Sequence, residues 1–498
     1  MRKGGYDGVR RALLPLLVAG LVAGVGGLGP DARAADATPA PTTTVTVGGC
    51  AVNAPVVPAD YLGLSIEWSM VQHWFGTSAD TAVAATVRLL QELGDDGVLR
   101  IGGNSQDDYH WTPDGDPATN QLFSGVVTTG MVDALLEVAR RSGWHLVLGL
   151  NLKVDQPEKA AALVRYAVLQ DIDRRLLAVA PGNEPDAYMP DVTSYLERYG
   201  RYVDALDADP LARTVPLTGP DVSNGVDLSW IEALRRAHSS RIGYLGWHDY
   251  GNRPSLATLL SPEVQQRFLS RVGLAEDAAA LVPQRMSEGN SVGRGGLGRV
   301  SDVTGSSAWT IDTILSGAQA GLAGYHLHSW DNHYYRSHPL KARYTPFFVR
   351  DGKTLPAPGV YALALVKEIA GKRFCGTTTS DLSAGLAGDL VKAWAATGLT
   401  ETSHVVYLVN KGTTSAHSGQ VAVTLPPGEV TASRINDLAG CSGRTTTING
   451  ATLQPDGTLQ WERAPLQRAE DGTVSVTVSP CQTVVLHVTD GPELPAPL

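Results

Sequence analysis

The sequence predicts an α/β fold in which a (β/α)8 TIM barrel is followed by a C-terminal β-sandwich domain. Two observations lead to this prediction. Eight short apolar segments alternate with stretches of helical periodicity between residues 61 and 330, which is typical of parallel βα units. After about residue 370 the composition changes to Thr, Val, Ser and Gly in short strand-like runs, which is typical of a β-sandwich.

The eight apolar segments begin 28 to 47 residues apart, and eight such units favour a closed barrel over an open sheet. Between them, Thr81–Leu93 and Met131–Arg141 repeat apolar residues every three to four positions, as amphipathic helices do. The predicted barrel strands are Tyr61–Glu67, Val98–Gly102, His145–Asn151, Leu177–Glu184, Thr214–Pro220, Ile242–His248, Val282–Glu288 and Ala323–Trp330.

The second domain is expected to consist of short strands, and Thr42–Val47 has the same Thr and Val character. The chain is therefore expected to begin in the sandwich, build the barrel and return. The predicted sandwich strands are Val391–Ala396, His404–Val409, Gln420–Leu425, Val474–Val478 and Thr483–Val488. The predicted boundaries are residues 35–58 for the N-terminal segment, 59–368 for the barrel, 369–490 for the sandwich and 491–498 for a tail.

Residues 1–34 have the pattern of a signal peptide, with basic residues ahead of an apolar stretch and Ala32-Arg33-Ala34 as a small-residue cleavage site. A membrane anchor is the weaker alternative, because glycines break the stretch and it is shorter than the ~20 apolar residues of a span. The mature protein is expected to be secreted, with no membrane association after cleavage.

The charge of the chain excludes one class of partner. Removing residues 1–34 takes away five basic and two acidic residues, so the formal net charge of −10 becomes −13. So acidic a protein is not expected to bind nucleic acid. The same acidity argues, more weakly, against a long polysulfated substrate, since no basic track is visible in the sequence.

Four cysteines, Cys50, Cys375, Cys441 and Cys481, are scattered without CxxC spacing, which disfavours zinc and redox roles. In an exported protein they can form disulfides, and one bridge could tie the N-terminal segment to the C-terminal domain. Four cysteines allow three pairings, and the sequence does not choose among them. No metal site and no cofactor is predicted, and the oligomeric state stays open.

Two glutamates 104 positions apart, Glu184 and Glu288, form the strongest functional pattern. Each follows an apolar run, so each is expected at the carboxyl end of a barrel strand, which is the active face of this fold. Each has a simpler interpretation alone: Asn183-Glu184-Pro185 can begin a helix, and Glu288 can be a carboxylate in a polar, Gly-rich loop. Together they predict a pair of catalytic carboxylates in one cleft, with Glu184 as acid/base and Glu288 as an ionised nucleophile.

Three overlapping patterns are weaker. Gly289–Gly293 matches the elbow that presents a nucleophilic serine, here Ser291, but a Gly-rich run follows instead of a helix. Gly293–Gly298 matches GxGxxG but lies late in the chain, and is better suited to bring backbone N–H groups close to an oxyanion. His326 and His328 could imitate a metal pair, but no carboxylate or Cys at ligand spacing completes it, so hydrogen-bonded histidines are favoured.

With these residues in place, most of residues 45–490 resembles glycoside hydrolase family 79, the family of β-glucuronidases and heparanases. The matching pieces are Ser65–Glu67, Arg100–Ser105, Gly182–Asp186, Trp247–Tyr250 and Ser287–Glu288 with its Gly-rich sequel. The resemblance implies a retaining mechanism acting on a glucuronic-acid-containing oligosaccharide or glycoconjugate, without a cofactor.

The resemblance also implies binding roles. Asn183 would hold the sugar 2-hydroxyl, Tyr250 would hydrogen-bond the nucleophile, and Glu67 and Asn104 would bind ring hydroxyls. The uronate carboxylate would be received by the backbone of Gly295 and Gly296 together with Tyr344. Arg294 departs from the family, in which this position is more often small or aromatic. Its side chain either adds a charge-assisted contact to the uronate or to a neighbouring sugar, or is exposed to solvent.

Two alternatives remain open from the sequence. The glutamate pair is shared across related families, so another retaining barrel glycosidase acting on xylosides or glucosides would look similar apart from the uronate-binding loop. A carbohydrate-binding protein without turnover is the alternative from another class. Whether cleavage is exo or endo, and what lies on the aglycone side, stay undetermined.

Overall fold

The computed structural model describes residues 42–50, 54–223, 228–336, 339–381, 390–398 and 403–489. The predicted signal peptide, residues 1–34, and the predicted tail, residues 491–498, lie outside the described residues.

Within the described residues, eight parallel strands form one sheet in the order β7-β6-β3-β2-β11-β10-β9-β8. Bridges from Leu217 to Val179 and to Ile242 link the two ends of this order and nearly close the sheet into a barrel. The predicted fold class is therefore confirmed. The strands are β2 (Leu62–Glu67), β3 (Val98–Gly102), β6 (His145–Leu150), β7 (Leu176–Pro181), β8 (Pro220–Val222), β9 (Leu245–Tyr250), β10 (Gln284–Asn290) and β11 (Gly324–Ser329).

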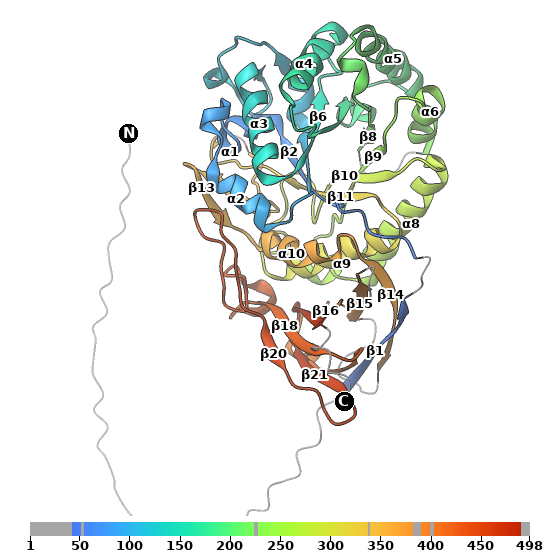
Figure 1. The fold of residues 1–498 in the computed structure, drawn as a ribbon, viewed down its shortest axis with the longest axis vertical. Coiled ribbons are helices and arrows are strands. Elements are labelled where there is room, and N and C mark those ends of the chain that lie inside the picture. The colour runs from blue at the N-terminus through green and yellow to red at the C-terminus, as the bar shows by residue number, and fades with distance from the viewer. Residues whose placement is uncertain are drawn as a thin grey trace, which may run out of the picture. The chain divides into compact units, whose positions relative to one another are not determined.

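Helices surround this sheet, as Figure 1 shows from blue through yellow. The longer ones are α2 (Ala84–Glu92), α3 (Thr129–Ser142), α4 (Pro157–Gln170), α5 (Val192–Ala208), α6 (Leu228–His238), α8 (Pro262–Ala279), α9 (Gly305–Gln319) and α10 (Pro358–Val366), and the short ones are α1 (Val71–Trp74) and α7 (Leu256–Leu259).

Helix α3 illustrates how the sequence defines these helices. The Thr128 hydroxyl accepts a hydrogen bond from the N–H of Met131 and caps the first turn, and Gly143 ends the helix at φ +85°. Met131, Leu135 and Val138 lie one turn apart on the buried face, which packs the helix onto the sheet.

The fifth strand differs from its prediction. Thr214–Pro220 was expected to be a strand, but Ala212–Thr214 is a 3-10 turn and β8 spans only Pro220–Val222. The apolar run between them contributes isolated bridges through Leu217 alone. Prolines at positions 216 and 220 have no N–H to donate, which limits regular pairing there.

The second domain is a mostly antiparallel sheet in the order β19-β18-β22-β16-β15-β14-β1-β17-β21, with β20 paired to β18. Valines and leucines from strands distant in this order, such as Val45, Val406 and Val484, share one buried cluster, as expected of a sandwich. The strands are β1 (Thr42–Cys50), β14 (Arg373–Asp381), β15 (Val391–Thr397), β16 (Ser403–Asn410), β17 (Gly419–Thr424), β18 (Glu429–Asn436), β19 (Thr447–Ile448), β20 (Ala464–Leu466), β21 (Thr473–Val478) and β22 (Thr483–Thr489).

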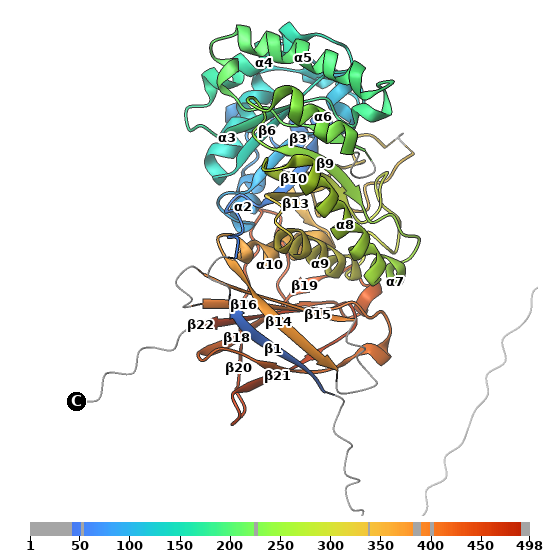
Figure 2. The same ribbon diagram turned by 90° about the vertical axis from the view of Figure 1, so that its right-hand side faces the viewer.

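Helices α9 and α10 lie between the barrel sheet and the sandwich (Figure 2). Every α9 residue from Gly305 to Ala318 is buried, because the helix is covered on both sides. The Tyr407 hydroxyl of β16 donates to the Leu365 carbonyl of α10 at 2.9 Å. Lys411 and Asp312 form an ion pair at 2.9 Å across the same boundary, with only 1% and 5% of their side chains exposed.

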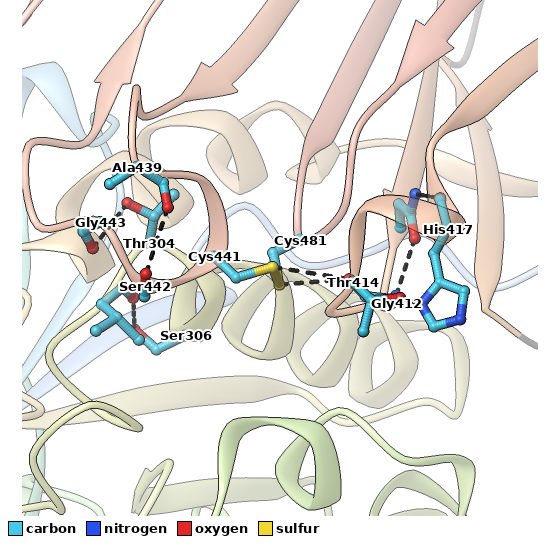
Figure 3. The surroundings of a disulfide bond; sticks show 12 residues. Thr304, Ser306, Gly412, Thr414, His417, Ala439, Cys441, Ser442, Gly443 and Cys481 are labelled. Carbon is cyan, nitrogen blue, oxygen red and sulfur yellow. Dashed lines mark hydrogen bonds between the residues drawn. A yellow bond between two sulfur atoms is a disulfide. The ribbon is translucent and has the colours of Figure 1, made fainter.

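The cysteines form two disulfides, Cys50–Cys375 and Cys441–Cys481, which selects one of the three pairings. The first joins β1 to β14. The second lies beside the start of α9, and both of its sulfur atoms face the Gly412 carbonyl (Figure 3). Two further two-stranded sheets accompany the barrel. One is the parallel pair β4 (Tyr109–Trp111) with β5 (Gly125–Val127), and the other is the antiparallel pair β12 (Phe347–Arg350) with β13 (Lys353–Pro356). No helix in the described part of the chain is long and apolar enough to cross a membrane.

Candidate active site

A cavity of about 470 Å³ opens at the carboxyl ends of the barrel strands. The predicted site residues that line it are Glu67, Asn104, Glu184, Tyr250, Glu288, Gly295 and Tyr344. Two others do not line it: Asn183 is buried directly behind it, and Gly296 lies in the turn beyond Gly295.

Glu184 follows β7 and points into the cavity. Its backbone takes the left-handed conformation, φ +47°, and its N–H donates to the Asp221 carbonyl at 2.9 Å. It precedes a 3-10 turn but its side chain caps nothing, so helix capping does not account for it. Instead, its Oε1 lies 3.0 Å from His248 Nδ1, and 25% of the side chain stays exposed.

Glu288 is more enclosed than predicted. It was expected as the last residue of a strand, at the start of a polar, Gly-rich loop, but β10 continues two residues further and is buried from Gln284 to Asn290. The pairing register with β9 shifts between Met286 and Glu288, an irregularity of the kind that redirects side chains near active sites.

The carboxylate of Glu288 is held on every side by polar groups. Tyr250 donates to Oε1 at 2.7 Å, and Arg100 donates to Oε2 at 3.0 Å. His328 Nδ1 lies 3.4 Å from Oε2, and His248 Nδ1 lies 4.0 Å from Oε1. Only 7% of the side chain is exposed.

These contacts decide the charge of Glu288. Burial raises its pKa, but His328, His248 and Arg100, together with the Tyr250 hydrogen bond, outweigh burial and lower the pKa to about 2. Burial lowers the pKa of His328, but Glu288 and Glu67 reverse this effect, so the pKa of His328 is raised. Glu288 is therefore ionised at neutral pH because of the cations around it and not because a loop exposes it to water.

The two glutamates face one another. One carboxylate oxygen of Glu184, one of Glu288 and a ring nitrogen of His248 all lie within 4.8 Å of each other. Such a trio could bind a cation, but the Arg100 guanidinium already neutralises Glu288, which disfavours a second cation there. A short carboxylate separation, about 5–5.5 Å, is typical of retaining glycosidases, whereas inverting enzymes need about 6.5–9.5 Å.

Arg100 connects the site and had no predicted role. Its Nη1 donates to Ser65 and Glu288, and its Nη2 donates to Asn183 at 2.7 Å and to Asp221 at 3.0 Å. Its side chain is 1% exposed. An arginine in the middle of the apolar run Val98–Gly102 was the signal, since a buried cation requires buried anions.

Asp221 is the second residue that the sequence analysis missed. It is fully buried, and its Oδ1 accepts from the Ser287 hydroxyl at 2.6 Å while its Oδ2 contacts Arg100. Because its carbonyl also accepts from the Glu184 N–H, it connects the loop of Glu184 to the strand of Glu288. It lies in a strand whose position was predicted wrongly, so no pattern indicated it.

Glu67 and Asn104 form another part of the cavity wall, and the buried Asn183 contacts this wall from behind. The Asn183 amide donates to Asn104 Oδ1 at 3.5 Å. Glu67 accepts from the backbone N–H of Asn104 at 3.1 Å and from Ser105 at 2.7 Å. Behind them the buried Asp107 accepts from the N–H of Asn183 at 2.9 Å, which fixes the backbone just ahead of Glu184.

The loop after β10 supplies the remaining predicted residues. Gly295 accepts at its carbonyl from the N–H of Arg343, 2.6 Å, and of Tyr344, 3.3 Å, so this loop is bonded to the segment after β11. Within the described residues the Gly295 N–H has no hydrogen-bond partner. The Gly296 N–H donates to the Gly293 carbonyl at 3.3 Å and is therefore occupied. Tyr344 is 5% exposed and packs near Tyr250.

The structure also tests the serine, histidine and tryptophan patterns of the sequence. Ser291 is 1% exposed, and the next helix, α9, begins only at Gly305, so no nucleophile elbow exists there. His328 shares a hydrogen bond with Ser65 at 3.1 Å, as favoured from the sequence. For His326 the interpretation is wrong, because both of its ring nitrogens are buried without a hydrogen-bond partner among the described residues. Trp330 lines the cavity, whereas Trp247 is buried in the barrel.

Comparison with known proteins gives similarity of fold alone. No family model matches the sequence, and no curated protein matches it. A solved structure of a 4-O-α-L-rhamnosyl-β-D-glucuronidase from Fusarium oxysporum 12S is similar with a TM-score of 0.65 and 17% identity, over 89% of this chain and 99% of that one. AbfB, a family 51 α-L-arabinofuranosidase from Bifidobacterium longum, is similar with a TM-score of 0.65 and 11% identity, over 90% and 99%. A GH51 arabinofuranosidase from Xanthomonas axonopodis pv. citri gives a TM-score of 0.64 and 14% identity, over 90% and 100%.

Proposed function

We propose that this protein is a secreted, retaining glycoside hydrolase that cleaves β-linked glucuronic acid from an oligosaccharide or glycoconjugate. The observation that carries the proposal is the pair of carboxylate oxygens of Glu184 and Glu288, within 4.8 Å of each other in one cavity. Oxygens this close favour a covalent route, because inverting enzymes hold their carboxyl groups about 6.5–9.5 Å apart to admit a water molecule.

In the proposed mechanism, a Glu288 oxygen attacks the anomeric carbon while the bond from that carbon to the glycosidic oxygen breaks. Glu184 gives its proton to the departing oxygen, and a glycosyl ester forms on Glu288. A water molecule then attacks the same carbon, Glu184 takes its proton, and Glu288 leaves as a carboxylate. Arg100 and Tyr250 hold the nucleophile in place through both steps.

The asymmetry of the two carboxylates supports these roles. Glu288 has four polar neighbours and a lowered pKa, which suits a group that must be ionised when it attacks. Glu184 has a 25% exposed side chain that water can reach, which suits a group that gains and loses a proton in each cycle.

Glucuronate specificity has its own support. Gly295 lines the cavity and its N–H has no hydrogen-bond partner in the described residues, while Tyr344 also lines the cavity and is bonded to the same loop. A backbone amide and a tyrosine can receive a carboxylate in the way that the family resemblance implies. The similar fold of a rhamnosyl-glucuronidase agrees with this assignment, while the arabinofuranosidases show that the fold alone does not determine the sugar.

The test is a panel of aryl β-glucuronides, β-glucosides and β-xylosides, assayed with wild type, Glu288→Gln and Glu184→Gln. We expect preference for the glucuronide, no turnover by Glu288→Gln, and a loss of about 10²–10⁴-fold for Glu184→Gln. Glu276→Gln, the same change at an exposed position on α8, is the matched control. Comparable rates on glucoside and glucuronide would refute the uronate assignment, and trapping the glycosyl ester on another residue would refute the mechanism.

A further inference from the structure

Positive charge gathers around the mouth of the cavity. The chain carries a formal charge of −10, yet four basic side chains lie within two short stretches, residues 294–299 after β10 and residues 341–343 after β11: Arg294, Arg299, Lys341 and Arg343. All four are exposed, and together they are called the basic rim.

The fold brings these residues together from positions up to 49 apart in the sequence. The Arg343 N–H donates to the Gly295 carbonyl at 2.6 Å, which fixes the second segment against the first. A Cβ added at Gly298 would lie 2.6 Å from the Arg343 guanidinium, so this side chain crosses the Gly-rich loop. The scattered basic residues therefore form one surface, which the sequence alone did not indicate.

Few acidic groups neutralise the basic rim. Asp302 contacts Arg343 at 3.4 Å, but it also contacts Arg444 at 2.9 Å. Within the described residues, Arg294, Arg299 and Lys341 have no ion-pair partner. The rim is thus a concentration of positive charge on an acidic protein, and such a surface attracts anions.

Arg294 extends this surface into the cavity, since it is the basic rim residue that lines it. Its backbone adopts φ +56°, a left-handed conformation in which a glycine would be unstrained, between Gly293 and Gly295.

The location of Arg294 distinguishes it from the proposed uronate site. Gly295 and Tyr344 are buried in the cavity wall, whereas Arg294 is exposed at the mouth. The Gly293 N–H donates to Asn252 Oδ1 at 2.8 Å, so the loop of Arg294 adjoins the segment after β9. Asn252 and Ser223 continue the cavity wall toward Glu184, where the leaving group must lie to receive its proton.

We propose that Arg294 and the basic rim bind a second anionic group of the substrate, a carboxylate or sulfate carried on the leaving-group side of the cleaved bond. This inference rests on the proposed function and narrows it, because it predicts substrates with two negative charges, such as fragments of an acidic polysaccharide. A guanidinium can form paired hydrogen bonds with either oxyanion, and the remaining cations add a longer-range attraction that salt weakens.

The experiment compares substrates that differ in two independent ways. The sugar is glucuronic acid or glucose, and the aryl leaving group is neutral, a benzoate or an aryl sulfate. Wild type, Arg294→Gln and Arg294→Lys are assayed on all six, and the ratio of kcat/KM between variant and wild type cancels the reactivity of each leaving group. Both variants keep a non-glycine residue at φ +56°, and Arg236→Gln, an exposed arginine on α6, is the control.

We expect Arg294→Gln to lower kcat/KM by about five- to tenfold on the anionic leaving groups and by less than twofold on the neutral one, whichever sugar is present. Arg294→Lys should recover most of the loss, and the advantage of the anionic leaving groups should shrink as salt is raised. Benzoate and sulfate report separately which oxyanion is preferred. Equal losses on neutral and anionic leaving groups, or losses that follow the sugar instead, would overturn the inference. Failure of the proposed function appears elsewhere, as a wild-type preference for glucosides.

Discussion

Asp221 offers the sharpest test of how the site is held together. Arg100 and Asp221 are each 1% exposed, and their 3.0 Å contact is one of two charge pairs that share the same guanidinium. Asp221→Asn removes one negative charge while nearly preserving volume. If the new amide oxygen keeps the bond to the Ser287 hydroxyl, its NH2 group must face the Arg100 Nη2, so two donors oppose each other.

The expected loss of stability depends on the contacts that Arg100 retains in the variant. Breaking a buried pair costs about 3–5 kcal/mol when the partner charge is left uncompensated. Arg100 still contacts Glu288, so we expect the lower end, about 3 kcal/mol, which corresponds to a fall of about 6 °C in the unfolding midpoint for a domain of this size. Glu288, no longer sharing the guanidinium, should also become a weaker nucleophile, and kcat/KM should fall by tenfold or more, about 1.4 kcal/mol.

The midpoint is measured by calorimetry and kcat/KM with an aryl glucuronide. Asp456→Asn provides the matched control, because Asp456 pairs with Arg88 on the surface, where the side chains are 59% and 55% exposed. That control should leave both quantities unchanged. A midpoint for Asp221→Asn equal to that of the control would show that the Arg100 contact with Asp221 contributes nothing, and the account of the buried network would be wrong.

Three further changes test other parts of the molecule. Tyr250→Phe removes the hydrogen bond to Glu288 Oε1 and should lower kcat/KM by about 10- to 100-fold with an unchanged unfolding midpoint. Tyr166→Phe, at a half-buried tyrosine on α4, should leave both kcat/KM and the midpoint unchanged. Burial raises the pKa of Asp107 to about 6, so its contribution to stability is present below its unfolded pKa of about 4 and is lost as pH rises through 6. Asp107→Asn should therefore flatten the dependence of the unfolding free energy on pH between about 4 and 6. An unchanged slope would count against the raised pKa. Lys411→Met leaves the buried Asp312 with only the more distant Lys392, at 3.6 Å, so we expect a loss of about 3 kcal/mol, the lower end for a broken buried pair. Lys353→Met, at an exposed position on β13, should have no effect, and denaturation midpoints measure both changes.

The sequence predicted the barrel because seven of its strands are apolar runs at regular spacing, and their positions agree with the structure to within a few residues. It failed at the fifth strand, where the strand is only three residues long and its key residue, Asp221, is charged. Periodicity detects strands that bury apolar side chains, and it does not detect a segment whose buried side chain is an ion.

The environment of Glu288 could not be predicted for a related reason. The Gly-rich residues that follow it suggested a loop, yet the strand continues to Asn290, and the groups that keep Glu288 ionised come from β3, β9 and β11. These strands are far apart in the chain and meet only when the barrel closes. A sequence can therefore indicate that two carboxylates share a cleft without indicating which cations control them.

Glu288 is buried and Glu184 is partly exposed because of how the charged groups around them are placed. Arg100 and Asp221 are each 1% exposed, and they contact Glu288 on one side and the backbone of Glu184 on the other. A fixed, desolvated set of charges costs folding energy, but it needs no reorganisation when charge moves during a reaction. Glu184 is joined to this set through its backbone N–H, so its position is fixed while its carboxyl group remains free to exchange protons with water. For this reason changes at Asp221 should act on both glutamates, through the Arg100 contact with Glu288 and through the backbone of Glu184, whereas changes at Tyr250 should act chiefly on Glu288.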